Sequence, residues 1–176
     1  MKPEIIDTML DGQVIKLKNC VPDDLDHNDL FNNYEKDFNF PDSAVGQLHQ
    51  YSYPYGHNDK RFDPIRKLLE IPDNYSAKIG LHEISAGGFI PPHADKHYYG
   101  GLTIFLNYEW DIDWGGWGMA YNDTGIITTV PSYGDAVFYK TPLLHCTAPV
   151  YVTDKVRRSI QIFYIEDNKW DDLARE

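Results

Sequence analysis

The chain has 176 residues, of which 42% are hydrophobic and 14% aromatic, and its formal net charge is −11. This length and apolar fraction suit a single domain with one core and exclude a disordered chain. The acidic charge disfavours nucleic acid as a partner, because nucleic acids are bound by basic surfaces. No apolar run approaches the ~18 residues of a membrane helix and no leader pattern is present, so we expect neither a membrane span nor secretion.

The two cysteines, Cys20 and Cys146, lie far apart in the chain. They form neither a closely spaced pair typical of metal sites nor a disulfide framework. Disulfides are characteristic of oxidising compartments, whereas isolated thiols are usual in reduced ones. The sequence therefore predicts a cytoplasmic protein in which neither cysteine is a metal ligand.

The N-terminal part, about residues 1–76, is expected to hold one strand and two short helices. The segment "QVIKLKNC", residues 13–20, alternates apolar and polar side chains as a half-buried strand does. The following segment, residues 21–38, begins with Pro22 and several aspartates, which favour a helix start. We predict a first helix there.

The second helix is predicted within "FDPIRKLLEIPD", residues 62–73. Asp63 can cap the helix, and Pro64 suits the first helical position because its fixed φ is already helical. Apolar residues follow at helical spacing, and Pro72 ends the run.

From residue 77 onward the pattern becomes β. Short runs rich in β-branched and aromatic residues are separated by Gly, Pro, Asn and Asp, which is typical of strands joined by turns. These runs cover residues 76–85, 101–110, 117–122, 125–132, 135–139, 145–152 and 157–165. We predict a mainly β protein with flanking N-terminal helices. Residues 1–176 would form one domain, with helical support over about 1–76 and a double-sheet jelly roll over about 77–165.

The segment "PPHAD" contains the first candidate ligands, His93 and Asp95. Residues i and i+2 of an extended strand point to the same face, so an imidazole and a carboxylate would meet at one spot. Such a pair alone is also common on ordinary surfaces. His145 supplies a third ligand at the start of another apolar strand. Two imidazoles and one carboxylate form the facial arrangement that holds Fe(II) in oxygen-activating enzymes, with coordination positions left open.

A cosubstrate site is predicted in "VRRSIQIFY", where Arg157 and Ser159 share one strand face and Arg158 points to the other. The alternative is a surface arginine pair flanking a core strand. A guanidinium offers a rigid fork of donors that matches a carboxylate, so a buried dicarboxylate would need such a partner at its far end. Arg157 with Ser159 is our candidate for this role.

Over about residues 77–165 the sequence resembles the Fe(II)- and 2-oxoglutarate-dependent dioxygenases. The resemblance is carried by "GGFIPPHAD", "LTIFLNYEWDIDWGG", "PSYGDAVFYKTPLLH" and "RRSIQIFY". The Leu-Asn followed by an acidic Trp-Gly-Gly segment is similar to the prolyl 4-hydroxylase group. The resemblance implies a double-stranded β-helix, iron held by His93, Asp95 and His145, and Arg157 on the distal carboxylate of 2-oxoglutarate. It also implies consumption of O2, release of succinate and CO2, and ascorbate as an optional reductant.

The sequence departs from that group at one cosubstrate position. Many members have a tyrosine on the strand after the His-x-Asp pair that also bonds the distal carboxylate, and the residue in that slot here is Phe105. Thr103, on the same face, could replace the missing donor. Tyr98 or Tyr99, at the mouth of the site, could also replace it, and the sequence does not choose among the three.

A second departure follows the Trp-Gly-Gly motif. The family continues with an acidic or small residue and then Leu, whereas this chain has Trp117 and Gly118. Gly115 and Gly116 are interpreted as a bend or a close backbone approach. His82 is expected to point outward from its strand.

Three functions are compatible with these residues. The first is hydroxylation of a prolyl residue in a peptide or protein, the second is hydroxylation of a free amino acid or other small metabolite, and the third is a non-catalytic jelly-roll module that keeps its metal for stability. The third is disfavoured because a structural metal site needs no Arg157. A nucleic-acid demethylase with the same triad is disfavoured by the acidic charge and by Phe163, where that group usually places a second arginine.

Overall fold

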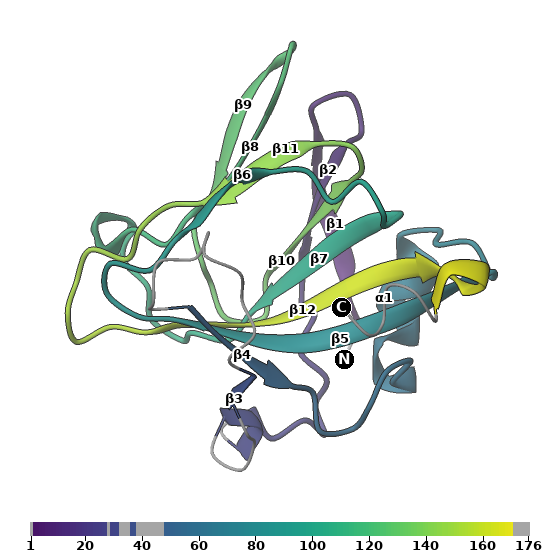
Figure 1. Cartoon of the computed structure of the whole chain (residues 1–176), viewed down its shortest axis with the longest axis horizontal. Helices are drawn as coiled ribbons and strands as arrows, with labels where there is room; N and C mark the ends of the chain where they lie inside the picture. Colours follow the sequence, from purple (N-terminus) through teal and green to yellow (C-terminus); the bar gives the residue numbers. More distant parts are fainter. Residues whose placement is uncertain (1, 28, 32–35, 38–47, 171–176) are drawn as a thin grey trace.

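The computed structural model describes residues 2–27, 29–31, 36–37 and 48–170. Its strands form two antiparallel sheets that face each other (Figure 1). The large sheet has the strand order β1-β2-β10-β7-β12-β5-β4-β3, and the small sheet has the order β6-β11-β8-β9. This arrangement is the predicted jelly roll. Among the described residues, no helix combines the length and apolar character that crossing a membrane requires.

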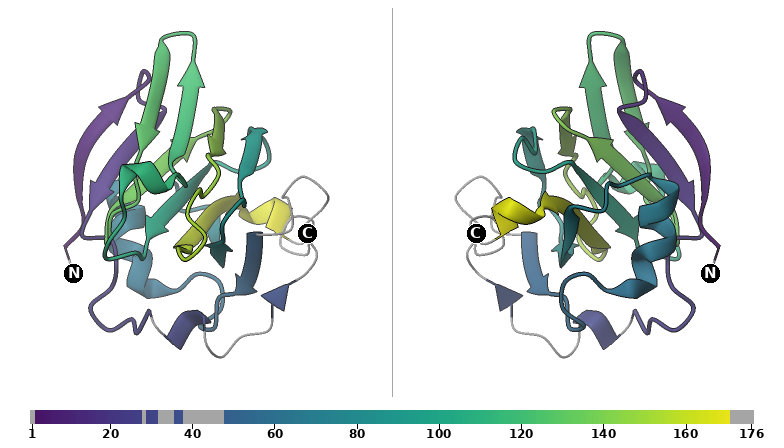
Figure 2. Two further views of the ribbon diagram at one scale, coloured as in Figure 1. Left: turned by 90° about the vertical axis from the view of Figure 1, so that its left-hand side faces the viewer. Right: turned by 90° about the vertical axis from the view of Figure 1, so that its right-hand side faces the viewer.

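The strand bounds follow in chain order. The large sheet contains β1 (Glu4–Met9), β2 (Val14–Lys18), β3 (Lys36–Asp37), β4 (Leu48–Ser52), β5 (Tyr75–Ile84), β7 (Gly100–Phe105), β10 (Ala136–Lys140) and β12 (Arg157–Glu166). The small sheet contains β6 (Ile90–His93), β8 (Gly118–Asn122), β9 (Gly125–Thr129) and β11 (Leu144–Thr147). The β8–β9 hairpin extends from the body of the molecule beside the β1–β2 hairpin (Figure 2), and Asn122 of β8 donates a 2.8 Å hydrogen bond to Gln13 between β1 and β2.

The predicted helix in residues 62–73 is present as α1 (Asp63–Leu68), with Pro64 in its first turn. It ends before Pro72, and Asp63 lies inside the helix rather than capping it. The cap that forms belongs to the preceding 3-10 turn η2 (Lys60–Phe62), where the Asp59 side chain accepts a hydrogen bond from the Arg61 backbone N–H. Further 3-10 turns are η1 (Asp29–Phe31), η3 (Ile112–Trp114) and η4 (Asp167–Lys169).

The predicted first helix, after Pro22, is wrong for the part that the structure describes. That part contains a turn closed by Leu25 N–H and Pro22 C=O, the single 3-10 turn η1, and β3. Leu25 and Leu30 are nevertheless buried in the core. The many Asp and Asn side chains compete with the helical backbone for hydrogen bonds, so the segment buries its apolar residues through turns.

The predicted strand in residues 13–20 is present as β2, but the N-terminal part is less helical than predicted, because β1 and β4 also join the large sheet. The first of these strands, "EIIDTM", has mostly exposed side chains and only one neighbour, β2. An edge strand of this kind carries no clear apolar alternation, which explains why the sequence pattern did not indicate it.

The two faces of the large sheet bury different side chains. One face packs under α1 as the main apolar core, and its members include Leu102, Ile104, Ile160 and Ile162. The alternate residues of the same strands face the small sheet. Several of these are buried and polar, namely His82, Thr103, Arg157, Ser159 and Gln161. Because strand side chains alternate, the same sequences that build the core also line the space between the sheets with polar groups.

Candidate metal and cosubstrate site

The site forms beside a glycine in the large sheet, at a position where the paired residues of the two neighbouring strands both carry aromatic side chains. Gly101 of β7 pairs with Tyr139 of β10 on one side and with Phe163 of β12 on the other. A Cβ atom at Gly101 would lie 3.3 Å from Asp95 Oδ2. The glycine therefore leaves the space that the Asp95 carboxylate uses between two aromatic neighbours.

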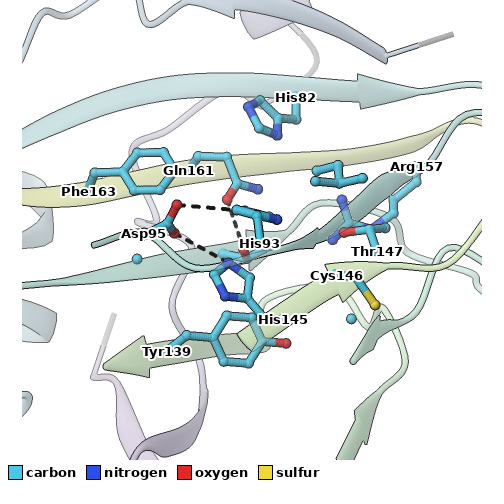
Figure 3. Close-up of a pocket in the computed structure, with 14 residues that line it drawn as sticks. His82, His93, Asp95, Tyr139, His145, Cys146, Thr147, Arg157, Gln161 and Phe163 are labelled. Carbon is cyan, nitrogen blue, oxygen red and sulfur yellow. Dashed lines mark hydrogen bonds and ion pairs between the residues drawn. The ribbon is translucent and has the colours of Figure 1, made fainter. Parts of the chain in front are cut away.

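The three predicted metal ligands converge in this space (Figure 3). His93 ends β6 and lies directly opposite His145 of β11, with ring centroids 4.3 Å apart. Asp95 follows β6, with its oxygens 3.6 Å from His93 Nε2 and 3.3 Å from His145 Nε2. One ligand atom from each residue lies within 4.8 Å of the other two. His93 and His145, which are 52 positions apart in the sequence, are thus brought together by strand pairing.

The hydrogen bonds of both imidazoles suit metal coordination. His93 Nδ1 lies 2.8 Å from the Pro91 carbonyl oxygen, and His145 Nδ1 lies 2.9 Å from the Leu143 carbonyl oxygen. A carbonyl only accepts, so each Nδ1 donates, and in the neutral ring Nε2 keeps its lone pair. Both Nε2 atoms face Asp95. Two oriented imidazoles and one carboxylate are a donor set that fits Fe(II), with backbone carbonyls fixing the ring orientation.

Arg157 lies in the same pocket and is 2% exposed. Its Nη1 donates to Ser159 Oγ over 3.3 Å, while its buried Nε has no hydrogen-bond partner among the described residues. Burial lowers the pKa of Arg157 to about 10, and Tyr139 partly offsets this effect. No carboxylate of the described chain pairs with it. A buried guanidinium without an anionic partner is costly, so this position favours an anionic ligand.

A chain of hydrogen bonds connects Arg157 to the floor of the pocket. Ser159 Oγ also accepts from Gln161 Nε2 over 2.9 Å, and Thr103 Oγ1 donates to Gln161 Oε1 over 2.8 Å. All of these side chains are buried. Thr103 and Ser159, two of the residues predicted to bind the cosubstrate, are thus joined to Arg157 by one hydrogen-bond network. Gln161 was not predicted, although its spacing of two from Ser159 on β12 could have indicated it.

Arg158 has different surroundings from Arg157. Its Nε donates to Glu83 Oε2 over 3.1 Å, and its guanidinium lies 5.0 Å from the Phe31 ring centroid. Its backbone N–H donates to Asn107 Oδ1. Of the two adjacent arginines, Arg157 therefore faces the pocket, whereas Arg158 points to the opposite side of the strand and pairs with Glu83.

Two buried aromatic residues lie beside functional candidates, one at Arg157 and one at His145. Phe105 is fully buried, and its ring centroid lies 5.2 Å from the Arg157 guanidinium. The Tyr139 ring lies 4.8 Å from that of His145. Burial raises the pKa of Tyr139, and Arg157 and Thr129 lower it in part. Tyr139 was also missed from the sequence, although its alternation with Val137 in "DAVFYK" places it on the inner face.

The glycines of the Trp-Gly-Gly-Trp-Gly segment lie at close approaches, as predicted for the first two. Gly115 and Gly116 have φ of 74° and 66°, which favour glycine. A Cβ at Gly116 would lie 3.2 Å from Arg157 Cδ. The segment therefore packs its backbone against the arginine stem.

The remaining predicted candidates divide between core and rim. His82 does not point outward: it is buried, lines the pocket, and its Nε2 lies 2.8 Å from Gln50 Nε2. The expectation failed because His82 lies in the row of β5 that faces the pocket, opposite Ser159 of β12. Tyr99 packs against the main core, whereas Tyr98 lies 4.8 Å from the Phe163 ring at the Asp95 side.

Comparisons with known proteins agree with the fold. No family model matches the chain, and neither does any curated protein. Among solved structures it resembles a Pseudomonas putida prolyl-4-hydroxylase (TM-score 0.51, 17% identity), covering 61% of this chain and 60% of that one. It also resembles a Trichoplax adhaerens prolyl hydroxylase in complex with a hypoxia inducible factor peptide fragment (TM-score 0.55, 16% identity), covering 73% of this chain and 69% of that one. A third similar structure is a Burkholderia pseudomallei oxidoreductase of the 2OG-Fe(II) oxygenase family (TM-score 0.57, 13% identity), covering 79% of this chain and 75% of that one.

These likenesses establish an architecture. The chain has the jelly-roll fold of 2-oxoglutarate- and Fe(II)-dependent oxygenases. Within that fold it is similar to prolyl hydroxylases, as the sequence resemblance implied. At 13% to 17% identity, similarity of fold does not assign chemistry, which has to be argued from the site.

Proposed function

We propose that the protein is an Fe(II)- and 2-oxoglutarate-dependent oxygenase. The observation that carries the proposal is the combination, in one pocket, of the His93, Asp95 and His145 cluster with a buried Arg157 that lacks an anionic partner. A metal-binding module that served only stability would gain nothing from a buried, uncompensated guanidinium. A dicarboxylate that reaches from the metal to the arginine uses both features.

Each group has a separate task in this proposal. His93, Asp95 and His145 hold Fe(II), and Arg157 with Ser159 holds the distal carboxylate of 2-oxoglutarate. When bound, iron and 2-oxoglutarate supply oxygen activation coupled to oxidative decarboxylation, with succinate and CO2 as coproducts. The surrounding sheets keep Arg157, Ser159 and Gln161 away from water, which strengthens their hydrogen bonds to a charged ligand.

For the substrate we propose a prolyl residue in a peptide or protein. Tyr98 and Phe163 form an aromatic wall beside Asp95, which suits an apolar ring presented to the metal. A prolyl segment has a fixed φ, so it loses little conformational entropy when it binds in extended form. Two of the similar solved structures are prolyl hydroxylases, and one contains a peptide.

The proposal is tested by incubating the protein with Fe(II), 2-oxoglutarate, ascorbate and a panel of peptides or free amino acids. We expect succinate formation matched by a gain of one oxygen on a peptide proline in the mass spectrum. If free amino acids are hydroxylated and the peptides are not, the substrate is a small metabolite and the proposal of a peptide substrate is wrong. Absence of any 2-oxoglutarate turnover, together with intact metal binding, would favour the non-catalytic module. The cytoplasmic location remains a separate prediction, which localisation of a tagged chain would check.

A further inference from the structure

Arg157 needs help to hold a carboxylate. Its Nη1 already donates to Ser159, and the position on β7 that the resemblance assigns to a second donor is occupied by Phe105. The Phe105 ring lies against the guanidinium and has no hydrogen-bonding group. A carboxylate has two oxygens with about four acceptor positions, so a second donor in this region would complete its binding.

The three candidates from the sequence are poorly placed for this role. Thr103 donates its hydroxyl proton to Gln161. Tyr98 stands with Phe163, at the Asp95 side of the pocket. Tyr99 packs against the main core under the large sheet. The donor must therefore be sought on another strand.

Tyr139 of β10 has the required properties. It lines the pocket together with Arg157, and Figure 3 shows its hydroxyl directed away from Asp95, on the side where Cys146 lies. The hydroxyl is buried, and its neighbour is the equally buried Thr129 hydroxyl, with which it does not form a hydrogen bond of acceptable geometry. Tyr139 and Arg157 line the same pocket from β10 and β12, the two strands that flank β7. A buried phenol without a partner is costly unless a ligand completes it.

Gly118 explains how the phenol is accommodated. A Cβ atom at Gly118 would lie 2.7 Å from the Tyr139 hydroxyl oxygen, which is shorter than real Cβ contacts. Gly118 is the residue where the family pattern continues with leucine after Trp-Gly-Gly. Leucine there would occupy the space of the phenol. The two departures, Phe105 and Gly118, thus have one explanation: the donor has moved from β7 to the neighbouring strand β10.

We propose that the Tyr139 hydroxyl is the second hydrogen-bond donor, beside Arg157, to the distal carboxylate of 2-oxoglutarate, and that Gly118 provides the space for it. This inference rests on the proposed function, because it concerns the same cosubstrate. It assigns a cosubstrate-binding role to a residue that has no counterpart in the sequence resemblance.

The test measures binding of 2-oxoglutarate, and of 2-oxobutyrate, which lacks the distal carboxylate, to the Mn(II)-loaded protein by calorimetry. We expect Tyr139→Phe to weaken 2-oxoglutarate binding about 10-fold to 100-fold, the range for one hydrogen bond to a charged group. Binding of 2-oxobutyrate should not change. Mn(II) affinity should also be unchanged, because phenylalanine keeps the ring that lies against His145. The exposed Tyr151→Phe is the matched control and should behave as wild type.

A second pair of variants tests the role of Gly118. Gly118→Ala should weaken 2-oxoglutarate binding in the wild-type background and have a smaller effect in the Tyr139→Phe background, because the hydroxyl that it displaces is then absent. Thr147, the other hydroxyl residue that lines the pocket near Arg157, is the competing donor. If Thr147→Val weakens 2-oxoglutarate selectively and Tyr139→Phe does not, the inference is overturned.

The outcomes separate this inference from the proposed function. Equal losses of 2-oxoglutarate and 2-oxobutyrate binding in Tyr139→Phe would show a general packing role for Tyr139 and contradict the inference, while the oxygenase proposal would stand. Failure of the wild-type protein to bind 2-oxoglutarate at all would contradict the proposed function itself. Circular dichroism and the thermal midpoint of each variant establish that it is folded.

Discussion

At the scale of single residues, the consecutive arginines of β12 show how alternation decides function. Arg157 faces the pocket and lacks an anionic partner in the described chain, whereas Arg158 faces Glu83 and the Phe31 ring. Their sequence context is the same, but their electrostatic environments are opposite. Only the first can gain from an anionic ligand.

Replacement of the two arginines should therefore have unequal effects. Arg157→Ala should weaken 2-oxoglutarate binding by about 2–5 kcal/mol, the range for removing one partner of a buried charged pair. Arg158→Ala removes a partly exposed ion pair and should leave this affinity nearly unchanged. Titration of each Mn(II)-loaded variant with 2-oxoglutarate measures both values, and equal small effects would contradict the assignment.

The proposed metal ligands provide a second prediction for single residues. Replacement of a residue that only supports a ligand typically reduces metal affinity about 10- to 100-fold. Asp95→Asn and His145→Ala should each reduce Fe(II) or Mn(II) affinity by more than this. His97→Ala is the control, because His97 is nearby in sequence but exposed and outside the cluster. Anaerobic Fe(II) titration measures the change. Retention of wild-type affinity in His145→Ala would place the metal elsewhere.

At the scale of elements, β7 depends on two glycines for its place in the large sheet. Gly101 leaves room for Asp95 on the inner face, and Gly100 lies against Phe138 on the other. A Cβ at Gly100 would also lie 2.8 Å from the Tyr139 backbone oxygen. Neither neighbour can move freely, because Phe138 is buried and Tyr139 is paired within the sheet.

Overpacking of a core usually costs about 1–3 kcal/mol, and Gly100→Ala should lower the free energy of unfolding by at least this amount. Gly80→Ala on β5 is the matched control, since the nearest atom to its Cβ would be Tyr51 O at 3.9 Å. It should change the free energy of unfolding by less than about 1 kcal/mol. Urea denaturation of both variants measures the difference, and a similar stability for the two would show that the sheet adapts more than the packing suggests.

The elements themselves were predictable to different degrees. Strands that are buried on at least one face, such as β5 and β12, show alternation or an apolar run and were predicted close to their bounds. The short β6 contains Pro91 and Pro92, which hide its strand character. The mistaken helix after Pro22 shows that start signals do not form a helix when the following residues favour turns.

At the scale of the whole molecule, burial of histidine couples stability to pH. Burial lowers the pKa of His82 to about 3, with Arg157 as the next cause. In the unfolded chain the pKa of histidine is about 6.5. Between these values the unfolded state binds a proton that the folded state refuses, so stability rises with pH and is lost as pH falls below about 6.5.

We expect His82→Gln to reduce this dependence. In the wild-type protein, His82 contributes up to about 1.4 kcal/mol of unfolding free energy per pH unit in this window. Urea denaturation between pH about 6.5 and about 5 isolates the histidines from most carboxyl groups. Burial and Lys78 also lower the pKa of His57, so His57→Gln is the comparison, and it should reduce the slope less because His57 is less buried. An unchanged slope in His82→Gln would contradict the prediction.

The sequence alone determined the residue types of the candidate metal site, the alternation of the main strands and the face on which Arg157 lies, because these depend on local spacing. Tertiary structure decided which distant residues meet. His93 reaches His145 by pairing of β6 with β11, and His82 is buried because its row of β5 faces the pocket. The place of the Tyr139 hydroxyl in the pocket that Arg157 also lines depends on the missing side chain of Gly118, which lies on another strand. Such arrangements depend on how strands pair and sheets face each other, and these long-range contacts leave no local signal in the chain.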